Sequence, residues 1–141
     1  MKKTGSQKIK TANFGMHLML DAYGANEEPL NDMRTVYRFL DVLPSKIGMH
    51  KLANPIVVDA LPTNSGKDPG GVTGFVLIAE SHISIHTFPK RKFFTLDLYS
   101  CNNFDQDVDT ILSFIKETFG FEEKELRVVK RGLKYPMMNL V

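Results

Sequence analysis

The chain has 141 residues, of which 43% are hydrophobic and 24% are charged, and these values are typical of one soluble globular domain. A net charge of +2 with scattered basic residues gives no support for nucleic-acid binding, and no apolar run reaches the ~18 residues that a membrane span needs. The single cysteine cannot form a disulfide within the chain, so a reducing, cytoplasmic setting is expected.

The N-terminal third predicts a tail, a strand and a helix. Residues 1–13 include four lysines in the first ten positions and no following apolar run, so we expect a disordered basic tail ahead of one domain over residues 14–141. Apolar and polar residues alternate up to Tyr23, which favours a strand. Asn31 is expected to cap a helix with one apolar face, and Pro44 is expected to end it.

The rest of the chain predicts mostly strands. A polar loop follows a short strand over 55–61, and three strands then come in quick succession, which indicates an antiparallel meander. Asp105 is expected to cap a second helix, and a last strand ends at Arg131. The order is β-α-β-β-β-β-α-β. It predicts an α+β two-layer sandwich, with two helices on one face of an antiparallel sheet, and a homodimer that covers the other face.

The most polar of these strands is the stretch from Glu80 to Pro89. His82 and His86 are four residues apart, and on a strand that is roughly 13 Å, too far for both to bind one metal ion, so no metal is expected. No G-x-S-x-G motif surrounds Ser81, which argues against a serine hydrolase. From spacing alone, Cys101 could equally be an inert buried residue, and the histidines could simply form a polar sheet face.

Three segments carry a resemblance to a known family. They are Gly-Gly-Val-Thr-Gly at 70–74, Glu-Ser-His-Ile-Ser-Ile-His-Thr-Phe-Pro at 80–89 and Asp-Leu-Tyr-Ser-Cys at 97–101. Together they resemble the prokaryotic S-adenosylmethionine decarboxylase proenzymes, over roughly residues 14–132. Ser81 precedes His86 by five residues and Cys101 by twenty, as in that family's pattern.

The resemblance implies a self-processing enzyme. The chain would cleave itself between Glu80 and Ser81 into chains 1–80 and 81–141. The Ser81 hydroxyl would attack the preceding carbonyl and turn the amide into an ester. His86 would act as the base that drives elimination, and Thr73, where the family usually has serine, would assist. The product would be a pyruvoyl group made from Ser81.

The resemblance also implies a reaction. The pyruvoyl group would form a Schiff base with the amine of S-adenosylmethionine and accept electrons as carbon dioxide leaves. Cys101 would then give a proton to the product, because a thiol is mostly protonated at neutral pH. Decarboxylated S-adenosylmethionine is the aminopropyl donor of spermidine, and hence polyamine, biosynthesis.

Strand geometry adds a constraint to this reading. Ser81 and His86 are an odd number of residues apart, so in a flat strand they face opposite sides, about 16 Å apart. A symmetric homodimer removes the difficulty if Ser81 and Cys101 of one protomer meet Thr73 and His86 of the other. The resemblance implies the same arrangement, because members of that family build each site from two protomers.

Two positions depart from the family pattern. Lys90 stands where a ribose-binding glutamate is usual, and Lys67 stands where an aromatic residue usually stacks on adenine. Phe14 is a plausible aromatic platform instead, and Lys90 remains a candidate substrate contact. These departures leave two alternatives open: a pyruvoyl-dependent arginine or ornithine decarboxylase, and a non-processing binding module of the same fold.

Overall fold

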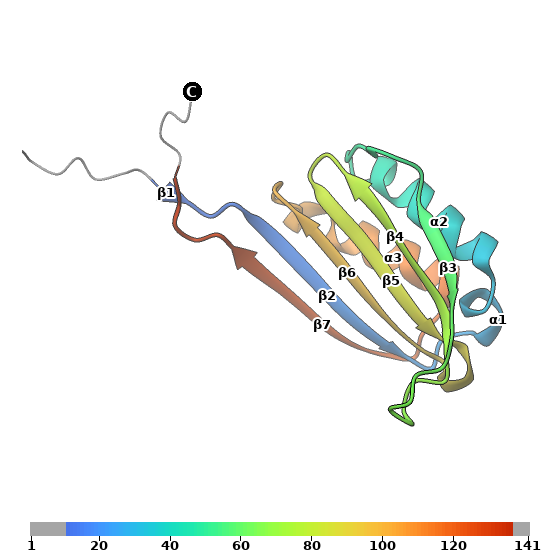
Figure 1. Ribbon diagram of the computed structural model, residues 1–141. Coiled ribbons are helices and arrows are strands. Elements are labelled where there is room, and N and C mark those ends of the chain that lie inside the picture. Colours follow the sequence, from blue (N-terminus) through green and yellow to red (C-terminus); the bar gives the residue numbers. More distant parts are fainter. Residues whose placement is uncertain (1–10, 137–141) are drawn as a thin grey trace, which may run out of the picture.

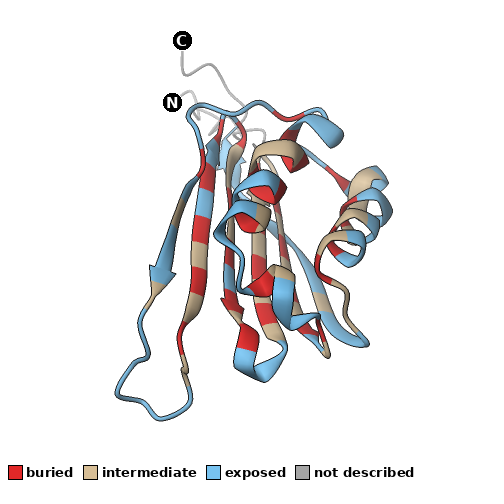
Figure 2. Cartoon of the chain, turned by 90° about the vertical axis from the view of Figure 1, so that its right-hand side faces the viewer, coloured by how far each residue is buried: buried red, intermediate tan, exposed pale blue. Residues whose placement is uncertain are grey.

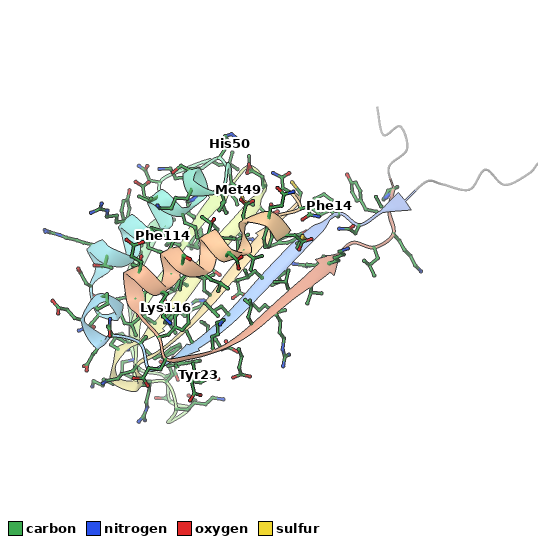
Figure 3. The ribbon with its side chains drawn as sticks, turned by 180° about the vertical axis from the view of Figure 1, so that it is seen from behind. Phe14, Tyr23, Met49, His50, Phe114 and Lys116 are labelled. Atoms are coloured by element: carbon green, nitrogen blue, oxygen red, sulfur yellow. The ribbon has the colours of Figure 1, made fainter. Side chains whose placement is uncertain are left out.

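The structure is a computed structural model that describes residues 11–136. A six-stranded antiparallel sheet forms one layer, and two long helices lie together on one of its faces, behind the sheet in Figure 1 and in front of it in Figure 3. This arrangement confirms the predicted α+β class and element order. The elements of the main body are β2 (Gly15–Tyr23), α2 (Met33–Lys46), β3 (Ile56–Ala60), β4 (Gly71–Ile78), β5 (Ser81–Phe88), β6 (Phe93–Ser100), α3 (Val108–Phe119) and β7 (Glu123–Arg131).

The strand order in the sheet is β3-β4-β5-β6-β2-β7. The predicted meander occupies its middle, because β4, β5 and β6 pair in sequence order. Strand β2 then lies between β6 and β7, so Met16 pairs with Ser100 on one side and Lys130 on the other. This insertion brings the start of the domain beside the end of β6.

The core lies between the sheet and the helices. Alternate strand residues are buried, as the red bands along the strands in Figure 2 show. Phe39 of α2 packs on Phe114 and Phe119 of α3, with ring centroids 5.2 and 5.1 Å apart. Burial of these apolar side chains, at about 25 cal/mol per Å², is what holds the helices on the sheet. Fully buried core residues include Leu18, Leu20, Phe39, Leu40, Val76, Ile83, Ile85, Phe94, Leu98, Ile115 and Phe119.

The start of α2 differs from the prediction. A one-turn helix, α1 (Glu27–Leu30), comes first, and Asn31 closes it by donating its N–H to the carbonyl of Glu27 at 3.1 Å. Asp32 therefore caps α2, accepting from the backbone N–H of Arg34 at 3.2 Å. The expected cap at Asn31 was wrong because the turn before the helix is itself helical and uses that residue.

Two further boundaries, at the end of α2 and at the start of α3, differ from the prediction. Pro44 lies inside the last turn of α2, where its carbonyl accepts from Met49 N–H at 2.8 Å and so closes the helix beyond it. Asp105 begins a 3-10 turn, η2 (Asp105–Asp107), ahead of α3, so it does not cap that helix.

At the N-terminus, strand β1 (Thr11–Ala12) pairs with β8 (Tyr135–Pro136), so ordered structure begins before residue 14; residues 1–10 of the predicted tail lie outside the described residues. The prediction placed the boundary too late because two residues carry no periodic signal, and their pairing partner is more than a hundred positions away.

The face of the sheet opposite the helices is open. Among the described residues no helix covers it, and it is the face toward the viewer in Figure 1. Large apolar side chains stand exposed on it, and exposed apolar patches of this kind mark interaction surfaces. They are Ile56, Val58, Phe75, Leu77 and Val129.

Candidate active site

The Glu80–Ser81 peptide bond lies at the tight turn between β4 and β5. Ala79 and Glu80 form the turn, and Ser81 is the first residue of β5, paired with Ile78 and Ser100. Ser81 has φ = +149°, a value that residues with a side chain rarely adopt. Such backbone conformations cost of order 1–3 kcal/mol and persist only where the surroundings impose them. Strain is therefore located on the residue that the family resemblance predicts to be the nucleophile.

The carbonyl group of Glu80 is held by the end of β6. The backbone N–H of Cys101 donates to the Glu80 carbonyl oxygen at 2.8 Å. A hydrogen bond to this oxygen polarises the carbonyl carbon and stabilises the negative charge that nucleophilic attack places on the oxygen. Gly15 lets β2 approach this point closely, because a Cβ there would lie 2.2 Å from the Ser100 carbonyl oxygen.

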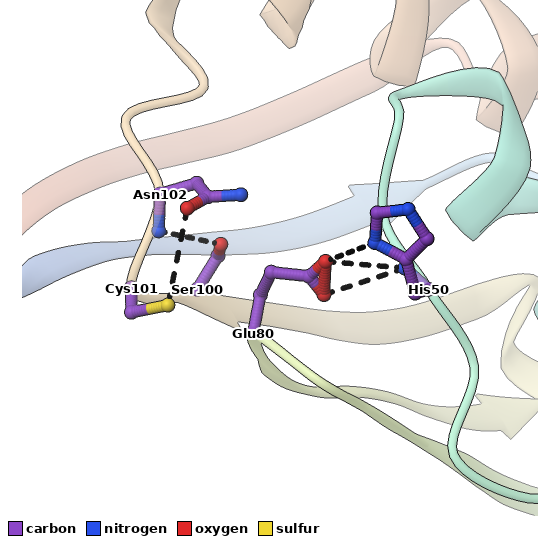
Figure 4. A network of polar contacts seen from close by, with 5 residues as sticks. All are labelled: His50, Glu80, Ser100, Cys101 and Asn102. Atoms are coloured by element: carbon purple, nitrogen blue, oxygen red, sulfur yellow. Dashed lines mark hydrogen bonds and ion pairs between the residues drawn. The ribbon is translucent and has the colours of Figure 1, made fainter.

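The side chain of Glu80 is held from the opposite direction (Figure 4). Glu80 is 6% exposed, and its carboxylate accepts from the backbone N–H of His50 at 3.2 and 3.3 Å and pairs with the His50 Nδ1 at 2.8 Å. Burial works against the charged form, but the hydrogen bonds from the His50 side chain and backbone outweigh it. The pKa of Glu80 is therefore lowered.

Polar groups of Ser100, Cys101 and Asn102 surround the same point. Ser100 is fully buried, and its Oγ accepts from the Asn102 backbone N–H at 3.0 Å. The thiol of Cys101 is half-buried and lies 3.9 Å from the Asn102 Oδ1. Cys101 thus offers its backbone N–H to Glu80, while its thiol is a separate group that contacts Asn102 and remains partly exposed.

Thr73 and His86 form a second, separate group on the open face of the sheet. They are paired across β4 and β5, and the Thr73 Oγ1 lies 3.2 Å from the His86 Nδ1. Ser81 is in register with buried Ile78 and Ser100, whereas His86 is in register with Thr73 and Thr95. Since residues in register share a face, the chain does not bring its own His86 to Ser81.

The two candidate substrate contacts lie at opposite ends of the molecule. The Phe14 ring lies at the Cys101 end, where it packs on Tyr99 and Tyr135 with centroids 6.4 and 4.8 Å apart. Lys90 follows β5 in the 3-10 turn η1 (Pro89–Arg91), beyond the far end of a strand that spans roughly 23 Å from Ser81 at about 3.3 Å per residue. It borders a pocket of about 270 Å³ whose other charged lining residues are Glu27 and Asp59.

His50 and Ser100 are site residues that the sequence reading missed. His50 lies in an irregular segment between α2 and β3, thirty residues before its partner, and no periodic pattern marks it. Ser100 precedes Cys101 directly, and only the alternation along β6 indicates that its side chain is buried. Their roles depend on chain crossings that a single sequence does not reveal.

The other two histidines near this end of the sheet contact side chains of neighbouring strands. His82 packs edge-on against Tyr99 at 5.7 Å, and His17 Nε2 lies 2.8 Å from Asp97 Oδ1. Within residues 11–136, no three His, Cys, Asp or Glu side chains gather in a way that could hold a metal ion. None of the described helices is long and apolar enough to cross a membrane.

Comparison with solved structures supports the fold. The crystal structure of the adenosylmethionine decarboxylase from Aquifex aeolicus superposes with a TM-score of 0.72, covering 91% of this chain and 98% of that one, at 24% sequence identity. At that identity the likeness concerns the fold, and it agrees with the two-layer α+β arrangement described above.

Comparison of sequences identifies the family. The S-adenosylmethionine decarboxylase family model matches residues 16–132. A Bacillus anthracis protein named S-adenosylmethionine decarboxylase proenzyme 2 is 31% identical, over 89% of this chain and 94% of that protein. An Anoxybacillus flavithermus S-adenosylmethionine decarboxylase proenzyme is 29% identical, over 84% and 88% of the two chains. The chain belongs to the S-adenosylmethionine decarboxylase family.

Proposed function

We propose that this protein is a self-processing decarboxylase of S-adenosylmethionine, which serves spermidine biosynthesis in the cytoplasm and makes its own pyruvoyl group from Ser81. The observation that carries the proposal is the geometry of the Glu80–Ser81 bond. A strained serine follows a carbonyl that already accepts a hydrogen bond from Cys101 N–H at 2.8 Å. Membership of a family whose relatives are named as proenzymes supports it.

The cleavage chemistry follows from the groups at this turn. The Ser81 Oγ attacks the Glu80 carbonyl carbon, and the Cys101 N–H stabilises the oxyanion. Collapse breaks the C–N bond and leaves an ester with a free Ser81 amine. Removal of the Ser81 Cα proton then expels the Glu80 carboxylate and leaves dehydroalanine. Hydrolysis of that residue releases ammonia and leaves the pyruvoyl group on chain 81–141.

The base for this elimination is proposed to come from a second protomer. Thr73 and His86 are hydrogen-bond neighbours on the open face, and that face carries exposed apolar side chains that a partner would bury. A homodimer through the open face would place His86 and Thr73 at the interface. Ser81 is the first residue of β5, at the end of the sheet, so we propose that the partner's His86 and Thr73 reach it around that end and not across the face. An imidazole suits proton abstraction near neutral pH.

The residues at this end of the sheet also fit the second reaction. The pyruvoyl group, when formed, supplies an electrophilic carbonyl that withdraws electrons from the substrate as carbon dioxide leaves. The Cys101 thiol is half-buried beside Ser81's pairing partner and donates a proton to the product carbon. We propose that Phe14 offers its ring to the adenine and that Lys90 contacts substrate held by the partner's half of the site.

Intact-mass measurement of the purified protein tests self-processing. We expect two fragments, 1–80 and 81–141, in place of the 15.9 kDa chain. The fragment that begins at residue 81 should be blocked to N-terminal sequencing. Release of labelled carbon dioxide from S-adenosylmethionine, arginine and ornithine in parallel tests the substrate. A chain that stays intact would contradict the proposed enzyme function. Release of carbon dioxide from arginine or ornithine, but not from S-adenosylmethionine, would show that an amino acid is the substrate instead.

A further inference from the structure

A short segment, His50 to Leu52, runs along the end of β4 and holds the turn that contains the cleavage site. The backbone N–H of Ala79 donates to the His50 carbonyl at 2.8 Å, and the N–H of Leu52 donates to the Leu77 carbonyl at 2.9 Å. Buried Met49, which Figure 3 shows beside His50, anchors the segment in the core. The turn is therefore tied to a part of the chain that comes directly from α2.

Within this segment the side chain of His50 makes one specific contact. Its Nδ1 lies 2.8 Å from the Glu80 Oε1, and the His50 side chain is otherwise 78% exposed. The Glu80 side chain is 7% exposed, so its carboxylate depends on these donors to stay charged inside the protein. Within residues 11–136, His50 is therefore the one imidazole that hydrogen-bonds to the residue before the proposed cleavage point.

Glu80 is consequently held at two points on either side of its Cα atom. The carboxylate is fixed by His50, and the carbonyl oxygen is fixed by Cys101 N–H. Two such constraints limit rotation of the peptide plane that leads to Ser81. An unusual φ such as that of Ser81 persists only where contacts of this kind impose it.

We propose that His50 is a positioning residue for self-cleavage, whose imidazole holds the Glu80 carboxylate so that the Glu80 carbonyl stays on the Cys101 N–H and Ser81 stays in its strained conformation. This inference rests on the proposed self-cleavage after Glu80. His50 acts through Glu80 and does not touch the reacting atoms, so its loss slows cleavage without abolishing it.

The test measures the rate of cleavage of unprocessed chain made in a short pulse of cell-free synthesis, followed by gel electrophoresis and mass spectrometry. His50→Ala removes the imidazole but keeps the backbone N–H, and we expect cleavage to slow about ten-fold, which corresponds to one hydrogen bond to a charged group. His50→Asn places an amide donor near the Nδ1 position, so it should restore most of the rate. Lys51→Ala is the matched control, because its side chain pairs with Asp41, and it should cleave at the wild-type rate.

A double-mutant cycle separates positioning from general damage. If His50 acts through Glu80, His50→Ala slows cleavage of the parent chain but has little effect in a Glu80→Ala background. Equal slowing in both backgrounds, or an Asn variant as slow as the Ala variant, would overturn the proposal, as would an Ala variant that cleaves at the parent rate. Failure of the wild-type chain to cleave after Glu80 would instead remove the proposed function on which the inference depends. Melting temperatures of each variant in a Ser81→Ala background confirm that the chains are folded.

Discussion

Ser81 and His86 stand on the same strand, β5, but belong to opposite faces of the sheet. Ser81 is in register with buried Ser100, and His86 is in register with Thr73 on the open face. The regular ladder of β5 contains no displaced register between them. This separation is the observation that supports the proposed use of a second protomer in self-cleavage.

Mixed dimers test this division of the site. We expect Ser81→Ala and His86→Ala chains to remain uncleaved when each is made alone. When the two are co-expressed with different tags and the mixed dimer is purified, only the His86→Ala chain should be cleaved, because it keeps Ser81 and receives His86 from its partner. Mass spectrometry of each tagged chain gives the result.

A second pair of variants controls for non-specific rescue. A mixed dimer of His86→Ala and Thr73→Val chains has a defect in the base group of both protomers, so neither of its sites is complete. We expect the His86→Ala chain to be cleaved more slowly in that pair than in the first, because its partner supplies His86 without the assisting Thr73. Equal cleavage of the His86→Ala chain in both pairs, or its cleavage when it is made alone, would show that His86 is not supplied across the dimer.

Cys101 is expected to separate the two reactions. Its backbone N–H donates to the Glu80 carbonyl, and its thiol is not part of that contact. Cys101→Ala should therefore still cleave, while decarboxylation should fall by roughly 10²- to 10⁴-fold through loss of the proton donor. Intact mass measures the first step and labelled carbon dioxide the second. Loss of cleavage together with decarboxylation would assign the thiol to processing as well.

The Glu80 carboxylate should make stability depend on acid pH. Its pKa is lowered in the folded protein, so its stabilising contribution is present above the unfolded glutamate pKa of about 4.3 and is lost as the pH falls below that value through the lowered pKa. In a Ser81→Ala background, Glu80→Gln should cost roughly 1–2 kcal/mol of unfolding free energy at pH 7. Urea unfolding measured from pH 7 to pH 3 should show the difference in unfolding free energy between the parent and Glu80→Gln becoming smaller. A difference that stays constant would contradict the lowered pKa of Glu80.

Gly15 should be intolerant of any side chain. A Cβ at Gly15 would lie 2.2 Å from the Ser100 carbonyl oxygen and 2.9 Å from the Cys101 Cα, so the end of β6 must move. We expect Gly15→Ala to lower the unfolding free energy by roughly 1–3 kcal/mol and to slow cleavage, because the Cys101 N–H shifts with it. Gly66→Ala is the control for cleavage: its φ of +75° makes an alanine there costly for stability, but a Cβ would meet nothing within 4 Å, so no neighbour of the site has to move. Equal effects of the two changes on cleavage would remove the link between Gly15 and the site.

Local features of the fold were predictable where one pattern dominated. A near-continuous apolar run predicted β4, clean alternation predicted β5, and apolar spacing predicted both long helices. Helix ends were less predictable, because Asn31 and Asp32 both have capping side chains and the choice depended on the extra turn α1. Pro44 stays inside α2 since only one backbone hydrogen bond is lost in the last turn, and that turn is buried against the core.

The sequence by itself determined the order of the elements, the separation of Ser81 and His86 onto opposite faces, and the family to which the motifs belong. These follow from periods of two and 3.6 residues and from short contiguous motifs, all of which are local. Only the tertiary structure decided that β2 enters between β6 and β7 and that His50 meets Glu80. Such contacts depend on how distant segments cross, and the free energy that selects one crossing comes from burial of the whole core.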